Sequence, residues 1–176
     1  IKSGGIASAY GLTIKSADTS GEINMYYGYI GSLGYEDLSS GYLTIDSGII
    51  DIDRGYIGAG NGGAIGDITI NNGMISVDAS TFPEYDGAAI GAGIASISLP
   101  GENRNAAGQA SCVNSITING GIVTAVAYKG AGIGSGEGLL GKGSSATDGM
   151  SITKNITING GMVTATSQVD GAGIGS

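Results

Sequence analysis

The feature that most constrains this chain is a pair of landmarks that alternate from one end of the sequence to the other. The first landmark is an Ile-Gly pair among small residues, found at 28–31, 55–58, 88–91, 131–134 and 172–175. The second is an apolar-Thr-Ile triplet, found at 12–14, 43–45, 68–70, 116–118 and 156–158. The spacing between Ile-Gly pairs drifts from 27 to 43 residues, so the alternation indicates an irregular solenoid whose coils keep their strands and vary their loops.

Each of the last four triplets is followed by a glycine-containing turn and a second alternating segment. These segments cover 49–53, 74–78, 122–126 and 162–166. Asn-Gly and Gly-Gly reach positive φ at little cost, so the chain can turn a corner there. The pattern predicts three short strands per coil: one at the Ile-Gly pair, one at the triplet and one after the turn.

Alternation with a period of two assigns the side chains of these strands to two faces. In the triplets the isoleucines point to one side and the central threonine to the other. In the third strands one face is shared by Ile50, Ile52, Ile75, Val77, Val123, Ala125, Val163 and Ala165. If coils stack at the strand spacing of about 4.8 Å, these residues form continuous buried columns.

We therefore expect an all-β fold, a right-handed parallel β-helix of about five coils with three short strands each and variable loops. Residues 1–176 form a single domain in this interpretation, and the interrupted pattern at both ends leads us to expect a fragment of a longer solenoid. An antiparallel arrangement with hairpins at the Asn-Gly turns is the alternative. It does not explain why one three-part pattern recurs in the same order.

Composition narrows the possible partners. Glycine accounts for 36 residues without a three-residue period, which argues against collagen. The net charge of −8 disfavours nucleic acid and anionic membranes, and is compatible with cations, neutral glycans or basic protein surfaces. Without histidine and with one cysteine, Cys112, the chain can form neither a His/Cys metal site nor an intrachain disulfide. No apolar run is long enough to cross a bilayer, so we expect no membrane insertion.

Two strings carry a resemblance to a known class of protein. Residues 130–136 and 116–125 resemble the Gly-Ala-Gly-Ile-Gly and Ile-Thr-Ile-x-Gly-Gly-x-Val-Thr-Ala repeats of large secreted or wall-attached proteins of Gram-positive gut and soil bacteria. The pattern is also similar to β-helical carbohydrate-binding domains of anaerobic cellulose degraders. The likeness covers residues 28–176 and implies an extracellular stalk, adhesin or glycan-binding role, although a fold does not fix a function.

Tyrosines supply nine of the ten aromatic residues and gather in the first third of the chain. Tyr29 and Tyr56 precede the Ile-Gly pair in successive coils, so their rings should stack. Together with Tyr26, Asp51 and Asp53 they predict a sugar-binding surface, in which rings cover apolar sugar faces and carboxylates accept hydrogen bonds from hydroxyl groups. The alternative is a structural ladder that only widens the contact between coils.

Three carboxylates are expected to meet on the outward face of the third strands. Asp51 and Asp53 lie two residues apart on one side of a strand, and Asp78 should lie one coil away. Such a group could bind a hard cation, and we name Ca²⁺ as the possible cofactor. The alternative is a solvated acidic face, because neither an EF-hand loop nor a calcium-binding solenoid repeat is present.

The sequence also contains two insertions and a column of polar residues at the turns. The insertions, 95–115 and 136–154, both follow an Ile-Gly pair and predict either a binding edge or a side lobe. They contain Leu99, Pro100, Arg104, Leu139, Leu140 and Lys142. At the turns, a ladder of amide hydrogen bonds is expected from Asp46, Asn71, Asn119 and Asn159.

From these features we expect a non-catalytic extracellular or cell-surface module, a stalk or an adhesin, that binds a glycan or a host or cell-surface protein. A polysaccharide lyase or glycoside hydrolase is the alternative, with Asp51, Asp53 and Asp78 as paired carboxylates. A lyase of acidic glycans also needs cationic clamps, and only Arg54 is near. Ice binding would need regular threonine arrays, which the long loops interrupt.

Overall fold

The computed structural model describes residues 2–8, 10–18, 20–32, 37–60, 62–81, 86–94, 110–137 and 150–175, and of residues 37–40 it describes the backbone only. Its strands form three sheets. The first sheet consists, in order, of β1 (Gly4–Ile6), β4 (Gly28–Ser32), β7 (Tyr56–Ala59), β10 (Ile90–Ala92), β13 (Ile133–Gly134) and β16 (Ile174–Gly175). The second consists of β2 (Leu12–Ile14), β5 (Asp37–Ile45), β8 (Ala64–Ile70), β11 (Ser111–Ile118) and β14 (Ser151–Ile158). The third consists of β3 (Glu22–Tyr26), β6 (Ile49–Asp53), β9 (Met74–Asp78), β12 (Ile122–Ala127) and β15 (Met162–Ser167).

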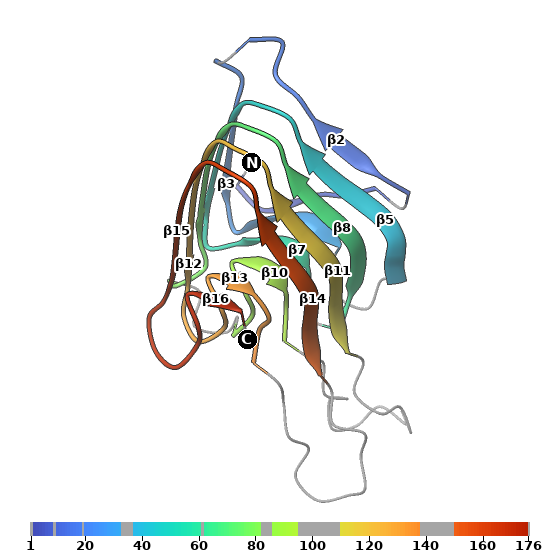
Figure 1. Ribbon diagram of the computed structural model, residues 1–176, viewed down its shortest axis with the longest axis vertical. Coiled ribbons are helices and arrows are strands. Elements are labelled where there is room, and N and C mark those ends of the chain that lie inside the picture. The colour runs from blue at the N-terminus through green and yellow to red at the C-terminus, as the bar shows by residue number, and fades with distance from the viewer. Residues whose placement is uncertain are drawn as a thin grey trace, which may run out of the picture.

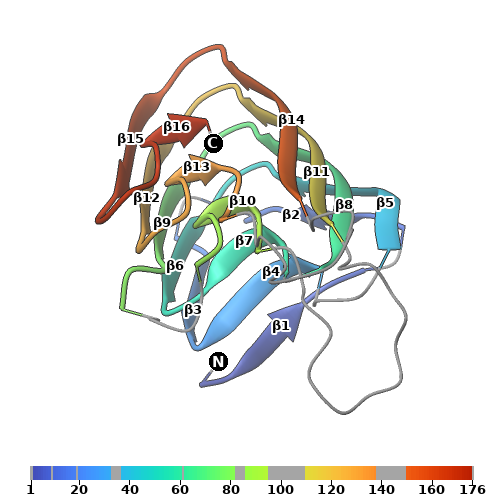
Figure 2. The same ribbon diagram turned by 90° about the horizontal axis from the view of Figure 1, so that it is seen from below.

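The chain visits the three sheets in turn and stacks each circuit on the one before it. Figure 1 shows the strands of the second sheet side by side in sequence order, and Figure 2 shows the successive coils stacked on one another. Every strand pair is parallel, which excludes the hairpin alternative. The chain is thus a right-handed parallel β-helix of five coils, with β16 in the first sheet after the fifth, as the sequence predicts.

Both sequence landmarks lie in register from coil to coil. The Ile-Gly pairs align at Ile30, Ile57, Ile90, Ile133 and Ile174, and the triplets align at Thr13, Thr44, Thr69, Thr117 and Thr157. The first coil contributes β1, in which Ile6 pairs with Ile30. Sequence reasoning did not assign β1 because Ile6 is followed by alanine, so the Ile-Gly landmark is missing there.

The interior is a set of isoleucine columns. Ile57, Ile68 and Ile118 are fully buried, and each buried side chain of this size contributes about 1.5–3 kcal/mol relative to exposure. Ile50 and Ile52 of the third sheet are equally enclosed, so the predicted inward face is confirmed. The first sheet differs from the other two, because consecutive residues are buried in its inner strands β7, β10 and β13, whichever way their side chains point.

The glycine of each Ile-Gly pair lets neighbouring coils approach closely. Gly31, Gly58, Gly91 and Gly134 all have φ between 135° and 142°. A Cβ atom on Gly58 would lie 2.1 Å from the carbonyl oxygen of Gly91, inside the adjacent coil. The landmark is therefore a backbone requirement, because a side chain would collide with the neighbouring strand.

The predicted amide ladder is also present, at the turn from the second strand to the third. Asn71 Nδ2 donates to Asp46 Oδ1 at 2.7 Å, Asn119 Nδ2 donates to Asn71 Oδ1 at 2.8 Å, and Asn159 Nδ2 donates to Asn119 Oδ1 at 2.7 Å. Every rung donates toward the preceding coil. Each bond contributes about 1 kcal/mol, and together they fix the stacking of this corner.

The two predicted insertions are shorter than expected, since β11 begins at Ser111 and β14 at Ser151. Ser111 is buried and its hydroxyl donates to the Gly60 carbonyl oxygen at 2.8 Å. Because this inward-facing residue is polar, a search for alternating apolar residues does not find the start of the strand. The insertion residues Leu99, Pro100, Arg104, Leu139, Leu140 and Lys142 lie outside the described part of the chain. In the part that is described, no helix is long and apolar enough to cross a membrane.

Candidate functional site

Several tyrosines and charged residues lie at one corner of the helix, where the third strand of a coil turns into the first strand of the next. We call this the return corner. In the first two coils one residue separates the third strand from a glycine: Tyr27 precedes Gly28, and Arg54 precedes Gly55. Both have left-handed backbones, with φ of 55° and 60°. Among the residues that the structure describes, no other residue apart from glycine has a positive φ. Such a conformation costs about 1–2 kcal/mol for a residue other than glycine, so a local arrangement holds both in place.

Hydrogen bonds and ring contacts provide that arrangement. The Tyr27 amide donates to the Asp53 carbonyl oxygen at 3.0 Å, and the Arg54 amide donates to that of Asp78 at 2.7 Å. Arg54 Nη1 donates to Tyr27 Oη at 2.5 Å, and the guanidinium carbon lies 5.3 Å from the ring centroids of both Tyr26 and Tyr27. The two rings meet edge to face, with centroids 4.6 Å apart.

The groups around Arg54 favour the charged form of its guanidinium. The hydrogen bond to Tyr27 raises the pKa of Arg54, and the charge of Asp53 adds to the effect. Tyr26 and Tyr27 keep 43% and 41% of their surface exposed, so both rings are accessible. Arg54 Nε is buried without a hydrogen-bond partner, which leaves a donor unsatisfied at the edge of the cluster.

The predicted carboxylates extend from this cluster along the third sheet. Asp53 lies in register between Tyr26 and Asp78, while Asp51 lies beside Ser76. Asp78 Oδ1 accepts hydrogen bonds from the amide and hydroxyl of Ser80, at 2.8 and 2.5 Å. Among the described residues no group of three or more His, Cys, Asp or Glu side chains is placed to bind a metal ion. The Ca²⁺ site at Asp51, Asp53 and Asp78 therefore stays a prediction.

Tyr29 and Tyr56 stack as the sequence predicts, with ring centroids 5.5 Å apart and ring planes 13° from parallel. They belong to the first sheet, whereas Tyr26, Asp51 and Asp53 belong to the third. Tyr56 is 9% exposed and its hydroxyl donates to the Ser32 carbonyl oxygen at 3.1 Å. The pair thus contributes mainly to the contact between coils, and offers a ligand less surface than Tyr26 does.

A second cluster at the return corner was not predicted from the sequence. Lys129, between β12 and β13, lies 3.2 Å from Asp86 Oδ2 and 4.0 Å from Glu137 Oε2. Its amino nitrogen is 5.8 Å from the Tyr128 ring centroid. The hydrogen bond to Asp86 raises the pKa of Lys129, with the charge of Glu137 adding to it. A cavity of about 250 Å³ adjoins the cluster, lined by Lys129, Ser135, Glu137, Asp170 and four small residues.

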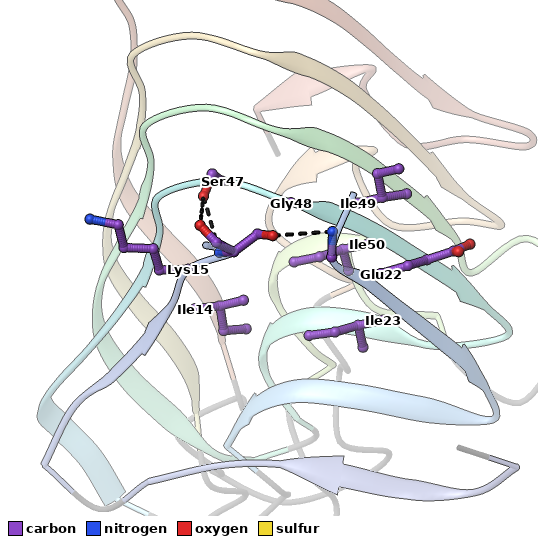
Figure 3. A pocket seen from close by; sticks show the side chains of 10 residues that line it. Ile14, Lys15, Glu22, Ile23, Ser47, Gly48, Ile49 and Ile50 are labelled. Atoms are coloured by element: carbon purple, nitrogen blue, oxygen red, sulfur yellow. Dashed lines mark hydrogen bonds between the residues drawn. The ribbon is translucent and has the colours of Figure 1, made fainter. Parts of the chain in front are cut away.

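A separate cavity, of about 210 Å³, lies at the turn between the second and third strands of the first coil (Figure 3). Inward-facing Ile14 and Ile23 line it together with Ile50 of the next coil. Ser47 Oγ donates to the Ser16 carbonyl oxygen at 3.2 Å and accepts from the Ser16 amide at 3.1 Å. The first coil has a longer turn here than the later coils, and the apolar lining identifies the cavity as a gap at the end of the core.

The comparisons with known proteins agree with this architecture. Residues 116–137 and 156–176 match a family model described as a beta helix repeat. No curated protein and no solved structure matches the chain. The matched stretches pair in register along the second, third and first sheets, with Thr117 opposite Thr157 and Ile133 opposite Ile174. The two matched stretches are therefore parallel β-helix repeats.

Proposed function

We propose that this chain is a non-catalytic binding module of an extracellular or cell-surface stalk or adhesin, and that it binds a neutral glycan at the return corner. The observation that carries the proposal is the Tyr26–Tyr27–Arg54 cluster, in which two exposed rings surround a fixed guanidinium beside Asp53. Rings bury the apolar faces of sugars, while the guanidinium donates to hydroxyl oxygens and the carboxylate accepts from hydroxyl groups.

The charge around the cluster supports a neutral ligand over an acidic one. Arg54 is close to Asp53, and Asp78 follows Asp53 in the adjacent coil. The whole chain carries a net charge of −8, so a polyuronate would be repelled. Two left-handed residues at the same corner also support a binding role, because strained backbone gathers at sites where side chains must be presented in one orientation.

Native affinity electrophoresis tests the proposal. The protein is run through gels that contain hydroxyethylcellulose, galactomannan or polygalacturonate, and retention by a neutral polymer is expected. Tyr26→Ala should weaken binding about tenfold, equivalent to about 1.4 kcal/mol. Tyr27→Asn tests the second ring, since asparagine tolerates the left-handed backbone. Tyr42→Ala is the matched control, because Tyr42 is 52% exposed but lies on the second sheet.

Three outcomes contradict the proposal: no retention by either neutral polymer, preferential retention by polygalacturonate, or equal losses for Tyr26→Ala and Tyr42→Ala. Release of unsaturated or reducing ends from any of these polymers would establish the lyase or hydrolase alternative instead. Melting curves of each variant separate lost binding from lost folding.

A further inference from the structure

The turn from the second strand to the third has a different sequence in the third coil than in the coils that follow. The fourth and fifth coils turn through Asn-Gly-Gly, at 119–121 and 159–161, whereas the third coil turns through Asn-Asn-Gly, at 71–73. The last position must be glycine, because Gly73 has a φ of 120° and a Cβ atom there would lie 2.7 Å from a carbonyl oxygen of the second coil. The additional asparagine, Asn72, therefore stands directly before an obligatory glycine.

The Asn72 side chain is exposed and folds back onto that glycine. The Gly73 amide donates to Asn72 Oδ1 at 2.9 Å, so the amide nitrogen lies against the carboxamide group of the preceding residue. The backbone on either side is fixed, because the amides of Asn71 and Met74 donate to carbonyl oxygens of the second coil at 2.8 and 2.9 Å. The nitrogen and the carboxamide carbon are thus held in a contact from which a ring can close.

The asparagines of the amide ladder are held differently. Asn119 is also exposed and also precedes a glycine. Its carboxamide is engaged on both sides, since Nδ2 donates to Asn71 Oδ1 at 2.8 Å and Oδ1 accepts from Asn159 Nδ2 at 2.7 Å. Both bonds must break before this carboxamide can turn toward its own backbone, whereas the Asn72 carboxamide already contacts the amide that would attack it.

We propose that Asn72 is a site of spontaneous deamidation, at which the side-chain amide becomes a carboxylate through a cyclic imide. Hydroxide removes the Gly73 amide proton, and the nitrogen attacks Asn72 Cγ. The carboxamide nitrogen takes a proton from water and leaves as ammonia, so hydroxide is regenerated and a succinimide ring is closed. Water then opens the ring. Opening at the side-chain carbonyl gives aspartate, and opening at the main-chain carbonyl gives isoaspartate, in which the backbone runs through the side chain.

The products differ from asparagine in charge and in backbone length. Either one adds a negative charge to a chain whose net charge is −8. Isoaspartate also adds a carbon atom to the backbone, at a turn that is bonded to the coils on both sides: the Met74 amide donates to the second coil, and the Gly73 carbonyl oxygen accepts from the Ile122 amide at 2.8 Å. The amide ladder, besides fixing the stacking, protects Asn119 from the same reaction.

Peptide mass spectrometry of the folded protein, incubated at mildly alkaline pH in isotopically labelled water, tests the proposal. Asn72 should incorporate the label, with replacement of its amino group by a hydroxyl group, at least about tenfold faster than Asn119 does. Asn119 is thus a matched control within the same molecule. Hydroxylamine should trap the ring as a hydroxamate at residue 72. Asn72→Gln should remove the signal, because the longer side chain would have to close a larger ring.

Protein unfolded in guanidinium chloride supplies the reference rates. Both asparagines precede glycine, so without the fold the ratio of their rates should return to about one. Asn159→Ala removes one of the two bonds that hold Asn119, and should raise the rate there severalfold while the rate at Asn72 stays the same. A melting curve checks that this variant is folded, and an unchanged rate at Asn119 in it would overturn the protective role of the ladder.

The proposal itself is overturned by any of three results. Asn72 reacts no faster than Asn119 in the folded protein, or the ratio of the two rates is the same in folded and unfolded protein, or the carboxylate accumulates at residue 72 without a product trapped by hydroxylamine. None of these results bears on glycan binding, so this inference and the proposed function stand or fall separately.

Discussion

The glycine column of the first sheet should be sensitive to any added side chain. Gly91 in this column and Gly48 at the turn before β6 both have positive φ, 139° and 111°, so alanine is strained by the backbone at both. The two sites differ in what the new methyl group meets. At Gly91 it would lie 2.0 Å from the Gly134 carbonyl oxygen, whereas at Gly48 the nearest atom, the Gly21 carbonyl oxygen, is 3.2 Å away.

The backbone strain, about 1–3 kcal/mol, is common to both variants and largely cancels in the comparison. Only Gly91→Ala must also push two coils apart, since 2.0 Å is far inside the separation of about 3.5 Å at which non-bonded heavy atoms attract. Overpacking of this kind costs about 1–3 kcal/mol, so Gly91→Ala should lose that much more free energy of unfolding than Gly48→Ala.

Urea denaturation followed by circular dichroism measures the difference. With a denaturant slope of about 1–3 kcal/mol/M, the two midpoints should be separated by about 1 M. Gly31→Ala is a second test, because its methyl group would lie 2.1 Å from the Gly58 carbonyl oxygen. Equal midpoints for Gly91→Ala and Gly48→Ala would refute the view that the Ile-Gly landmark exists to let coils approach.

Three further predictions concern polar contacts. Asn119→Ala should lower the free energy of unfolding by about 1–2 kcal/mol, because it removes one donated and one accepted rung of the amide ladder, and chemical denaturation measures the loss. Hydrogen bonds from the Ser115 hydroxyl, which has the larger effect, and from Asn114 lower the pKa of Asp67. This carboxylate therefore stabilises the fold above its unfolded pKa of about 3.9, and the contribution is lost as the pH falls through the lower folded value. The stability difference between wild type and Ser115→Ala should therefore shrink over that acidic window, and an unchanged difference would contradict the assignment. If the outward carboxylates bind calcium, the melting temperature should rise with added Ca²⁺, and identical melts in calcium and chelator would remove that prediction.

The sequence predicts the second and third sheets well, because their inward residues are large and recur with a period of two. The columns through Ile68 and Ile75 are examples, and the strand after each turn was placed to within a residue or two. The β-helix follows from this alternation together with the constant order of the landmarks. Loop length did not affect the prediction, since each coil re-enters the same register after its loop.

The candidate site was predicted only in part, for a physical reason. Equivalent positions in a repeat reveal which residues stack, and Tyr29 and Tyr56 do stack. Whether a stacked ring faces solvent depends on how the first sheet is covered, and repeat spacing carries no information about that. The role of Tyr27 and Arg54 depends on a left-handed backbone at the residue that follows the third strand. The short interval between the end of the third strand and Gly28 or Gly55 is the signal that could have revealed it.

The amide ladder has a consequence for how the number of coils can change. Since each rung donates in the same direction, Asn119 and Asn159 present the same acceptor to whatever follows them and need the same acceptor before them. Excision of a whole winding, from Asn119 through Ile158, would bring Asn159 against Asn71 with every donor and acceptor still matched. Loop residues can be gained or lost without disturbing the ladder, because the rungs already join coils of different length. Excision of strand residues together with a corner asparagine, but without the rest of that winding, would leave one amide facing the wrong group, so at this corner the number of rungs changes only by complete windings.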